Sequence, residues 1–395
     1  MRIAIWWQQE AWGGVDTHLG ALLGAWPTGD EFTIFHNSGN PGLKRIEAVI
    51  AGRSVRTVAF PEWQVADRGL AVRLANYLLL PLRFGQAMRA ARAVLESHGP
   101  FDALIADNGS YPGAWTSLAA LWAAFRIGIA KRMLLVHHAA AGYTLGRRLF
   151  EQLVDRGVQT WTTDIVAVSR ATRDTLLRLR FFDSERCPIR VIHNGIQLPT
   201  EIVTDRKIRE SWGIAPETFV VGMVGRIERY KGHEDMLLAL AELPEDFRRR
   251  VRLVIVGTGS EDEIARLRQM ADRLALRAQV QFTDYVPGDS VIIAGQFDLL
   301  AMVTKDFEGF GLAIAEAMAA GTPVLATVVG AVSEFVTPEI ATLVPPESPS
   351  DIARSLEAIM RDPAAAKARA GLARVHIENF SADIMSRRFH RLLSL

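Results

Sequence analysis

The sequence has almost no cysteine and almost no net charge. Cys187 is the single cysteine among 395 residues, which excludes an internal disulfide and any cysteine-rich metal site. One cysteine suits a reducing compartment. Lysine and arginine number 45 and aspartate and glutamate number 44, so the formal net charge is +1. This balance gives no support to a nucleic-acid partner.

Long apolar runs are also missing. The longest, such as 74–82, are interrupted by Asn76 and Pro81, and none reaches the ~20 residues that a membrane-spanning helix needs. The first residues, Met-Arg-Ile-Ala-Ile-Trp-Trp, have the pattern of a strand and lack the layout of a signal peptide. We therefore expect a cytoplasmic protein that is soluble, or at most attached to the inner face of a membrane.

Short apolar runs separated by helical patterns recur along the whole chain. The first series comprises 3–7, 32–35, 55–60, 103–106, 133–136, 164–168 and 191–192, and the second comprises 220–224, 251–256, 280–282, 299–303, 324–328 and 342–344. Continuous rather than alternating apolar runs indicate parallel strands covered on both faces. Two series predict two doubly wound domains, and the polar segment 197–216 lies between them. A ligand is then expected in a cleft at the carboxyl ends of the strands.

The most informative stretch is 308–321, which follows the strand-like run 299–303. Glu308 lies in a predicted loop, and Glu316 lies about two turns inside the helix that we expect to follow. Gly309 and Gly311 leave the backbone bare, so a ligand can approach the N–H groups of the helix start. Those groups and the helix dipole favour an anion, most often phosphate. An anion site between two carboxylates suits a sugar attached to a phosphate, although two solvated glutamates on an ordinary helix are the alternative.

Other strand ends carry residues of matching chemistry. Arg226 and Lys231 follow the run 220–224 and precede a helical pattern, and two cations at the carboxyl end of a strand match a diphosphate. Gly257-Thr-Gly259 begins another helical segment, but the third glycine of a dinucleotide-binding fingerprint is missing.

Two features of the first half of the chain also lie at strand ends. Gly13 and Gly14 follow the first strand and would let a backbone approach a ligand, although glycine pairs are common in such turns. His137 and His138 follow the run 133–136. Adjacent strand residues point to opposite faces, so a zinc pair is not expected. One histidine in the site and one packed or solvated is the interpretation that we favour.

The segment 68–98 is basic and amphipathic. Five arginines, at positions 68, 73, 83, 89 and 92, stand against the single acid Glu96 and are interspersed with leucines. Such a segment can lie on an anionic membrane surface. An ordinary helix with one face in the core and a solvated basic face is the alternative.

Taken in order, these motifs resemble the retaining glycosyltransferases of family 4, which have the GT-B fold. The motifs that carry the resemblance are Gly13-Gly14, His137, Ser169, Asn194-Gly195, Gly225-Arg226, Lys231-Gly232, Gly257-Thr-Gly259, and Glu308 with Glu316 as an E-x7-E motif. The resemblance implies an α/β protein of two doubly wound Rossmann-like domains facing a central cleft. The acceptor-side domain would comprise 1–198 and a C-terminal helix, about 379–395, that crosses back to it. The nucleotide-sugar-binding domain would comprise 199–378.

The family implies a hexosyltransferase-type enzyme that moves a sugar from a nucleoside-diphosphate sugar, such as a UDP or GDP sugar, to an acceptor hydroxyl with retention. Arg226 and Lys231 would hold the donor diphosphate and stabilise the charge that develops on it. The backbone of Phe310, Gly311 and Leu312 would add N–H groups. Losing one preorganised donor of this kind typically costs roughly 100- to 1,000-fold in rate.

The same resemblance assigns roles to further residues. Glu316 would accept hydrogen bonds from the ribose, Glu308 would contact hydroxyls of the transferred sugar, and His137 would lie near that sugar. Gly13 and Gly14 would let the first domain close over the phosphates. Of these, the resemblance treats Glu308 and His137, with the two cations, as catalytic.

The nucleobase would lie near Tyr285 and Val286. No metal or other cofactor is implied, because the two cations already stabilise the leaving group and no Asp-x-Asp occurs in a suitable loop. Three positions depart from the family pattern: Thr304 and Lys305 stand where Pro-Ser is frequent, and His138 stands where Asp is frequent. These departures concern loop shape and donor choice rather than the class of reaction.

The partners implied are a nucleotide sugar, a glycan or lipid-linked acceptor, and a membrane surface through 68–98. Synthesis of a surface polysaccharide, a lipopolysaccharide or a glycolipid is the role expected. A sugar-nucleotide epimerase of the same fold and a non-catalytic sugar-nucleotide-binding protein are the alternatives. The pairing of Glu308 and Glu316 with Arg226 and Lys231 argues against the epimerase.

Overall fold

The computed structural model describes residues 1–27, 29–60, 77–201, 207–283 and 290–395. The chain divides into two compact units: unit 1 comprises Met1–Gly195 and Ala382–Leu395, and unit 2 comprises Ile196–Ser381. The boundary therefore lies at 195/196, where the sequence suggested 198/199, and the chain re-enters unit 1 at residue 382, where the sequence suggested about 379.

Unit 1 is built on a parallel sheet with the strand order β3-β2-β1-β4-β5-β6-β7. The strands are β1 (Arg2–Trp7), β2 (Glu31–Asn37), β3 (Val55–Phe60), β4 (Ala103–Asn108), β5 (Lys131–Val136), β6 (Asp164–Ala167) and β7 (Ile189–Val191). Ile5 of β1 pairs with Ile34 of β2 on one side and with Ile105 of β4 on the other. The strand order reverses between β1 and β4, and open α/β sheets bind ligands at such a switch point.

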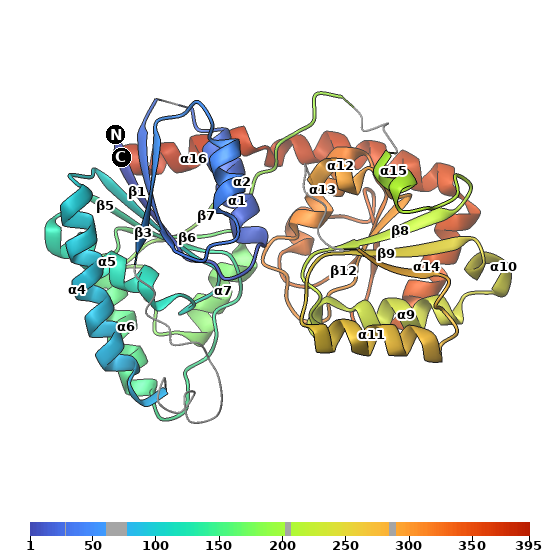
Figure 1. Ribbon diagram of the computed structural model, residues 1–395, viewed down its shortest axis with the longest axis horizontal. Helices are drawn as coiled ribbons and strands as arrows, with labels where there is room; N and C mark the ends of the chain where they lie inside the picture. Colours follow the sequence, from blue (N-terminus) through green and yellow to red (C-terminus); the bar gives the residue numbers. More distant parts are fainter. Residues whose placement is uncertain (28, 61–76, 202–206, 284–289) are drawn as a thin grey trace. The chain divides into compact units, whose positions relative to one another are not determined.

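Helices cover both faces of this sheet (Figure 1). The helices are α1 (Gly14–Gly24), α2 (Leu43–Val49), α4 (Leu80–His98), α5 (Trp115–Ile127), α6 (Arg148–Trp161), α7 (Arg170–Leu179) and α16 (Ala382–Ser394). α1 packs against α2 and α16, whereas α5 packs against α4 and α6. The Ser386 hydroxyl of α16 donates to the carbonyl of Leu22 in α1 at 2.9 Å. The helix that follows unit 2 in sequence thus completes unit 1, as the sequence predicted.

The basic segment 68–98 is described only from residue 77 onward, so Arg68 and Arg73 lie outside the described residues. In α4, Phe84, Ala87 and Leu95 are buried on one face. The opposite face carries the exposed Arg92, which forms an i,i+4 ion pair with Glu96 at 2.8 Å. Among the helices of the described ranges, none is both long enough and apolar enough to cross a membrane.

Unit 2 has a second parallel sheet, with the strand order β10-β9-β8-β11-β12-β13. The strands are β8 (Phe219–Val224), β9 (Val251–Val256), β10 (Val280–Thr283), β11 (Leu299–Met302), β12 (Val324–Thr327) and β13 (Thr342–Val344). Every apolar run of the second series coincides with one of these strands. The switch point of this sheet lies between β8 and β11, the strands that precede Arg226 and Glu308.

The helices of unit 2 lie on both sides of its sheet (Figure 1). They are α8 (Lys207–Ser211), α9 (His233–Glu242), α10 (Glu245–Arg248), α11 (Glu261–Arg273), α12 (Ser290–Ala294), α13 (Leu312–Ala320), α14 (Pro349–Arg361) and α15 (Pro363–Ile377), with the short 3₁₀ helices η1 (Arg229–Lys231), η2 (Val332–Glu334) and η3 (Glu378–Phe380). α9 packs against α11 and α14, and α13 packs against α12 and α15.

Helix α13 begins later than the sequence suggested. Gly311 takes a left-handed conformation with φ of 97°, so helical geometry starts only at Leu312. Glu316 therefore lies about one turn inside the helix, not about two. The predicted end is confirmed, because Gly321 adopts the left-handed C-cap conformation with φ of 73°.

Candidate functional site

The carboxyl ends of β8 and β11 bring a lysine and a glutamate together in unit 2. Lys231 lies in η1 after β8, and its Nζ atom is 2.7 Å from Oε2 of Glu308 in the loop after β11. Their side chains are only 20% and 12% exposed. Burial alone would lower the pKa of Lys231, but the Glu308 carboxylate outweighs it and the pKa is raised. Lys231 is therefore a charged, mostly buried ammonium group at the switch point of the sheet.

Two residues that the sequence marked only as departures from a family pattern connect these loops. The Thr304 hydroxyl donates to Glu308 Oε2 at 3.4 Å. The Lys305 ammonium group is 2.9 Å from Asp235 Oδ1 on α9, and the Lys305 N–H donates to the carbonyl of Tyr230 at 2.7 Å. Lys305 thus ties the loop after β11 to the loop that carries Lys231.

The backbone of Glu308 is held by the loop after β12. The Ala331 N–H donates to the Glu308 carbonyl at 2.9 Å. A Cβ atom on Gly330 would lie 2.2 Å from that same carbonyl oxygen, so no larger residue fits there without displacing Glu308. Sequence reasoning missed this contact, and the only signal for it was a glycine shortly after a strand.

Glu316 points from α13 toward the start of α12. Its side chain is buried, and the Ser290 hydroxyl donates to its Oε1 atom at 2.6 Å. Ser290 directly follows residues 284–289, so the predicted nucleobase contacts Tyr285 and Val286 lie outside the described residues. A sequence reading had no means of pairing Ser290 with Glu316, because the partners lie in different helices.

The remaining residues predicted for the site in unit 2 are Phe310, Gly311, Leu312 and Arg226. Phe310 is buried, and its ring stacks on Phe335 with centroids 4.6 Å apart. Gly311 caps α13, and Leu312 is the first helical residue. The half-exposed Arg226 guanidinium lies 3.1 Å from Glu228 in the same loop as Lys231.

In unit 1, the turn after β1 is held by a buried carboxyl group. The Gly13 N–H donates to Asp16 Oδ2 at 2.6 Å, and the Trp7 indole N–H donates to Oδ1 at 3.1 Å. Burial raises the pKa of Asp16 to about 7, against the lowering effect of the Gly13 hydrogen bond, and the charge of Asp107 contributes to the rise. Gly14, the first residue of α1, is exposed.

Gly13 itself is not required by the fold. Its φ of −169° is ordinary extended backbone, and a Cβ atom there would meet nothing within 4 Å. The glycine therefore leaves an uncovered stretch of backbone at the switch point of the first sheet, which a ligand can approach closely.

His137 lies at the carboxyl end of β5 and forms a buried pair with Asp107 of β4. Its Nε2 atom is 2.7 Å from Asp107 Oδ1. A carboxylate only accepts, so Nε2 donates this hydrogen bond. The ring of His18 packs edge-on against His137 with centroids 4.6 Å apart. His18 Nδ1 in turn lies 2.8 Å from Asn194 Oδ1.

This polar cluster has unused acceptors. Within the described residues, His18 Nε2, His137 Nδ1 and Asp107 Oδ2 are buried without a hydrogen-bond partner. Burial lowers the pKa of His18, so its ring is neutral and Nε2 is an acceptor. Buried polar atoms normally find partners, so the cluster suits water or a ligand rich in donor groups. The described residues contain no His, Cys, Asp and Glu grouping that could hold a metal ion.

Sequence reasoning selected His137 but not Asp107, and it did not connect His18 with Asn194. The signal that could have found Asp107 is its place at the end of a neighbouring parallel strand, because such ends meet at one edge of the sheet. His138 is only partly buried.

Comparison with known proteins shows what this chain is similar to. Residues 204–374, which lie in unit 2, match the family model described as glycosyl transferases group 1. A D-inositol 3-phosphate glycosyltransferase of Corynebacterium jeikeium is 31% identical over 222 residues, covering 53% of this chain and 52% of the relative. One of Corynebacterium diphtheriae is 27% identical over 372 residues, covering 89% of this chain and 82% of the relative. The chain spans about half the length of the first curated relatives that it matches.

Solved structures share the fold. HepE of Anabaena, crystallised in complex with UDP and glucose, is 22% identical, with a TM-score of 0.75 over 100% of this chain and 99% of that one. At this level of identity the likeness concerns the fold alone. The two parallel, Rossmann-like units are therefore those of the GT-B fold predicted from the sequence.

Proposed function

We propose that this chain is a retaining glycosyltransferase of family 4, of the hexosyltransferase type. It would move a sugar from a nucleoside-diphosphate sugar to an acceptor hydroxyl. The observation that supports this most is the buried Lys231–Glu308 pair at the switch point of unit 2, within the stretch that matches group 1 glycosyl transferases. Because HepE was crystallised with UDP and glucose and with UDP-glucose, we propose UDP as the donor nucleotide.

In this proposal, the chemistry of unit 2 centres on the departing diphosphate. The bond between the sugar C1 and the diphosphate oxygen breaks, and its electron pair leaves with UDP. Arg226, Lys231 and the backbone N–H groups of Phe310, Gly311 and Leu312 stabilise the negative charge that develops. A fixed ammonium group in a site that excludes water is far more effective than the same group in solution.

The two glutamates would recognise hydroxyl groups. Glu316, already accepting a hydrogen bond from Ser290, would accept others from the ribose. Glu308 would accept from hydroxyls of the transferred sugar while its charge holds Lys231 in place. Tyr285 and Val286 are proposed for the nucleobase.

Unit 1 would contribute His137, Gly13 and Gly14. Within the described residues, the three buried polar atoms of this cluster without partners support a contact with sugar hydroxyls, because a hydroxyl can donate or accept a hydrogen bond. The open space beside Gly13 and the exposure of Gly14 support approach of the phosphates.

Retention without an evident nucleophile favours attack by the acceptor oxygen on the face from which UDP departs. The acceptor proton then passes to the leaving diphosphate oxygen, so bonds and charges balance without a protein base. We propose that no metal is needed, because Arg226 and Lys231 supply the positive charge. Activity that falls more than twofold in EDTA and recovers with Mg²⁺ would contradict this part of the proposal.

The first experiment is a thermal-shift screen against UDP, GDP and ADP, followed by their sugar conjugates. A ligand at 100 times its Kd adds about 2.7 kcal/mol of stability. We expect UDP to raise the Tm of the wild type but not that of Glu316→Ala. The absence of a shift with every nucleotide would remove the main support for the donor site.

Reaction products separate the competing functions. Release of UDP from a UDP-sugar, with the sugar transferred to an acceptor or to water, supports a glycosyltransferase. Interconversion of free sugar nucleotide without an acceptor would identify an epimerase. A sugar nucleotide that binds and is never consumed would identify a binding protein.

We also propose that the acceptor is a glycan or lipid-linked molecule of surface polysaccharide, lipopolysaccharide or glycolipid synthesis, reached at the cytoplasmic face of a membrane. Exposed leucines around the start of α4 and along α6 support membrane contact: Leu78, Leu79, Leu82, Leu145, Leu149 and Leu153. The Tyr77 hydroxyl donates to the Leu145 carbonyl, so the two groups adjoin. The Arg147 guanidinium lies 4.3 Å from the Tyr77 ring centroid, placing positive charge beside them.

Vesicle pelleting tests this contact. We expect the wild type to pellet with vesicles that contain anionic phospholipid and not with neutral ones. Replacing Arg73 and Arg83 by Glu should abolish pelleting, because two positive charges that attract the anionic surface become negative charges that are repelled by it. Undiminished pelleting of that variant would contradict membrane contact through 68–98.

A further inference from the structure

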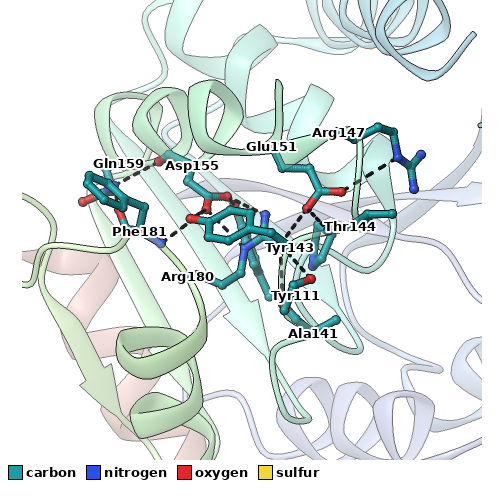
Figure 2. Close-up of polar contacts among 12 residues, drawn as sticks. Tyr111, Ala141, Tyr143, Thr144, Arg147, Glu151, Asp155, Gln159, Arg180 and Phe181 are labelled. Carbon is teal, nitrogen blue, oxygen red and sulfur yellow. Dashed lines mark hydrogen bonds and ion pairs between the residues drawn. The ribbon is translucent and has the colours of Figure 1, made fainter. Parts of the chain in front are cut away.

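A buried ionic network lies beneath the carboxyl edge of the first sheet, and no role proposed above uses it (Figure 2). At its centre is Arg180, which directly follows α7 and whose side chain is fully buried. Its Nη2 atom is 3.0 Å from Asp155 Oδ1, and its Nη1 atom is 3.0 Å from Glu151 Oε2, both on α6. Its guanidinium lies 5.1 Å and 4.2 Å from the ring centroids of Tyr111 and Tyr143.

The two tyrosines complete the network. The Tyr111 hydroxyl donates to Asp155 Oδ1 at 2.6 Å, and the Tyr143 hydroxyl donates to Oδ2 at 2.7 Å. Burial and the Asp155 carboxylate raise the pKa of both phenols, so they remain protonated donors. Each oxygen of Asp155 therefore accepts from both a guanidinium and a phenol.

The network is poorly explained by stability alone. One guanidinium faces two buried carboxylates, and removing charges from water is so costly that apolar residues of similar size often stabilise a fold as well or better. What such a network supplies, once every member is satisfied, is one fixed geometry. The question is then which part of the chain it fixes.

The part held is the pair of loops at the carboxyl edge. Tyr111 belongs to the loop 109–114 after β4, and Tyr143 belongs to the loop 137–147 after β5. The Arg180 Nη1 atom also reaches the Ala141 carbonyl at 3.4 Å, and the Thr144 N–H donates to Glu151 Oε2 at 3.2 Å.

The two loops are also joined to each other. The Ala141 N–H donates to the carbonyl of Tyr111 at 2.8 Å. Ala141 and Gly142 nevertheless have their outer sides exposed. The segment 141–144 is thus a surface loop that the buried network holds from its inner side, and it follows His137 in the same loop.

We propose that Arg180, Asp155, Glu151, Tyr111 and Tyr143 are positioning residues that hold the loops 109–114 and 137–147 as the acceptor-binding surface of unit 1. This inference rests on the proposed function, which it deepens. The network touches no substrate and acts through the loop backbone. His137 itself is held by Asp107 and by the end of β4, outside the network. The network therefore governs use of the acceptor and leaves release of UDP to water unchanged.

Two variants test the proposal. Tyr143→Phe keeps the ring against Arg180 and deletes the hydrogen bond to Asp155. A second variant replaces the whole network by apolar residues: Tyr111→Phe, Tyr143→Phe, Glu151→Met, Asp155→Leu and Arg180→Met. Phe125→Tyr, a hydroxyl change on the exposed surface of α5, is the matched control.

The first readout is the split between transfer and hydrolysis. The donor is UDP-glucose, and the acceptors are D-inositol 3-phosphate and a panel of alkyl glycosides. We expect kcat/KM for the acceptor to fall about threefold or more in Tyr143→Phe and at least tenfold in the apolar variant. Hydrolysis, the donor KM and the Tm should stay close to the wild-type values. Transfer that falls only in proportion to a fall in Tm, or full transfer by the apolar variant, would overturn the proposal.

The second readout is independent of activity. Hydrogen exchange at the amides of Ala141 and Thr144 reports directly whether the loop is held, and we expect it to quicken at least fivefold in Tyr143→Phe without global unfolding. Unchanged exchange there would overturn the positioning role even in an active enzyme. A wild type that consumes no sugar nucleotide would instead contradict the proposed function while leaving the exchange result to decide the loop restraint.

Discussion

At the scale of single residues, the Lys231–Glu308 pair is the central feature of the proposed donor site. The ammonium group is 2.7 Å from a carboxylate, so a bound diphosphate would share Lys231 with Glu308. A lysine held in this way has little conformational freedom to lose when a ligand binds, so the site is preorganised. Thr304 also donates to the same carboxylate oxygen.

The first prediction concerns these side chains. Lys231→Ala and Glu316→Ala should each lose most activity, with kcat falling roughly 100- to 1,000-fold for the lysine, because a preorganised positive group is lost. The measurement is steady-state UDP release, with far-ultraviolet circular dichroism to verify the fold. The exposed Lys367→Ala of α15 is the control. Full activity in both site variants would refute the site assignment.

The second prediction concerns Asp16, whose pKa burial raises to about 7. A carboxyl group that holds its proton more tightly in the folded chain contributes stability at low pH. That contribution is complete below about pH 4 and is lost as the pH rises through about 7, at about 1.4 kcal/mol for each unit of raised pKa. Asp16→Asn should therefore flatten the decline of stability between pH 5 and pH 8.

The measurement is the free energy of unfolding across that pH range for wild type and Asp16→Asn. The exposed Asp262→Asn serves as a control and should keep the wild-type slope. Parallel slopes for wild type and Asp16→Asn would show that the buried carboxyl group does not titrate in this range.

The sequence patterns marked some site residues and left others unmarked. Lys231, Glu308 and Glu316 stand in loops and helices with glycine and charge signals of their own. Asp107 lies inside an apolar strand, and only its pairing with His137 across two strands gives it a role. In the sequence, Lys305 is only a departure from the family pattern. Its role as a link between two loops is evident from its contacts with Asp235 and Tyr230. Long-range pairs of this kind leave no local pattern.

At the scale of elements, the proposed donor site is where the loops after β8, β11 and β12 meet. The β12 loop contributes no predicted side chain, yet it fixes the backbone of Glu308 through Gly330 and Ala331. The geometry of the glutamate thus depends on an element that carries no chemistry of its own.

The third prediction is that Gly330→Ala disturbs the site from outside it. A Cβ atom would lie 2.2 Å from the Glu308 carbonyl oxygen, at a φ of +54° that side chains rarely adopt. We expect a destabilisation of roughly 1–3 kcal/mol and at least tenfold weaker UDP binding. Calorimetry and titration with UDP provide the measurements.

A matched glycine offers the opposite outcome. Gly371 lies inside α15, and a Cβ atom there would meet nothing within 4 Å. Gly371→Ala should therefore raise stability by roughly 0.5–1 kcal/mol, since alanine is the better helix former. Equal effects of the two substitutions would contradict the argument from close approach.

The elements themselves were largely predictable. Strands buried on both faces are continuous apolar runs, so both sheets were evident from the sequence. The start of α13 was not, because a glycine inside a helix-forming stretch can be helical or left-handed, and only the tertiary fold selects between them. Because Gly311 is left-handed, Glu316 lies about one turn inside the helix, where the sequence predicted about two.

At the scale of the whole molecule, each unit has its own hydrophobic core. One core gathers residues such as Leu104 and Leu118 of unit 1, and the other gathers residues such as Leu253 and Leu299 of unit 2. Separate cores allow separate unfolding, so a single two-state transition is not expected.

The fourth prediction is that calorimetry resolves two transitions. Leu104→Ala should lower the Tm of one transition, and Leu253→Ala should lower the Tm of the other. Each substitution should reduce the free energy of unfolding of its unit by roughly 2–5 kcal/mol, since both side chains are fully buried. UDP should raise mainly the Tm of the transition that Leu253→Ala lowers, because its proposed ligands other than Gly13 and Gly14 lie in unit 2. One transition that both substitutions lower equally would mean that the units unfold together.

The order in which the chain is made adds a consequence of the placement of α16. This helix buries Met385 and Phe389 within unit 1, yet it is translated after all of unit 2. At roughly 5–20 residues per second, the ribosome exposes α1 many seconds before its covering helix exists. The nascent unit 1 therefore exposes the apolar surface that α16 later covers, while unit 2 can already complete its own fold. We expect chaperones to bind the nascent chain at that surface.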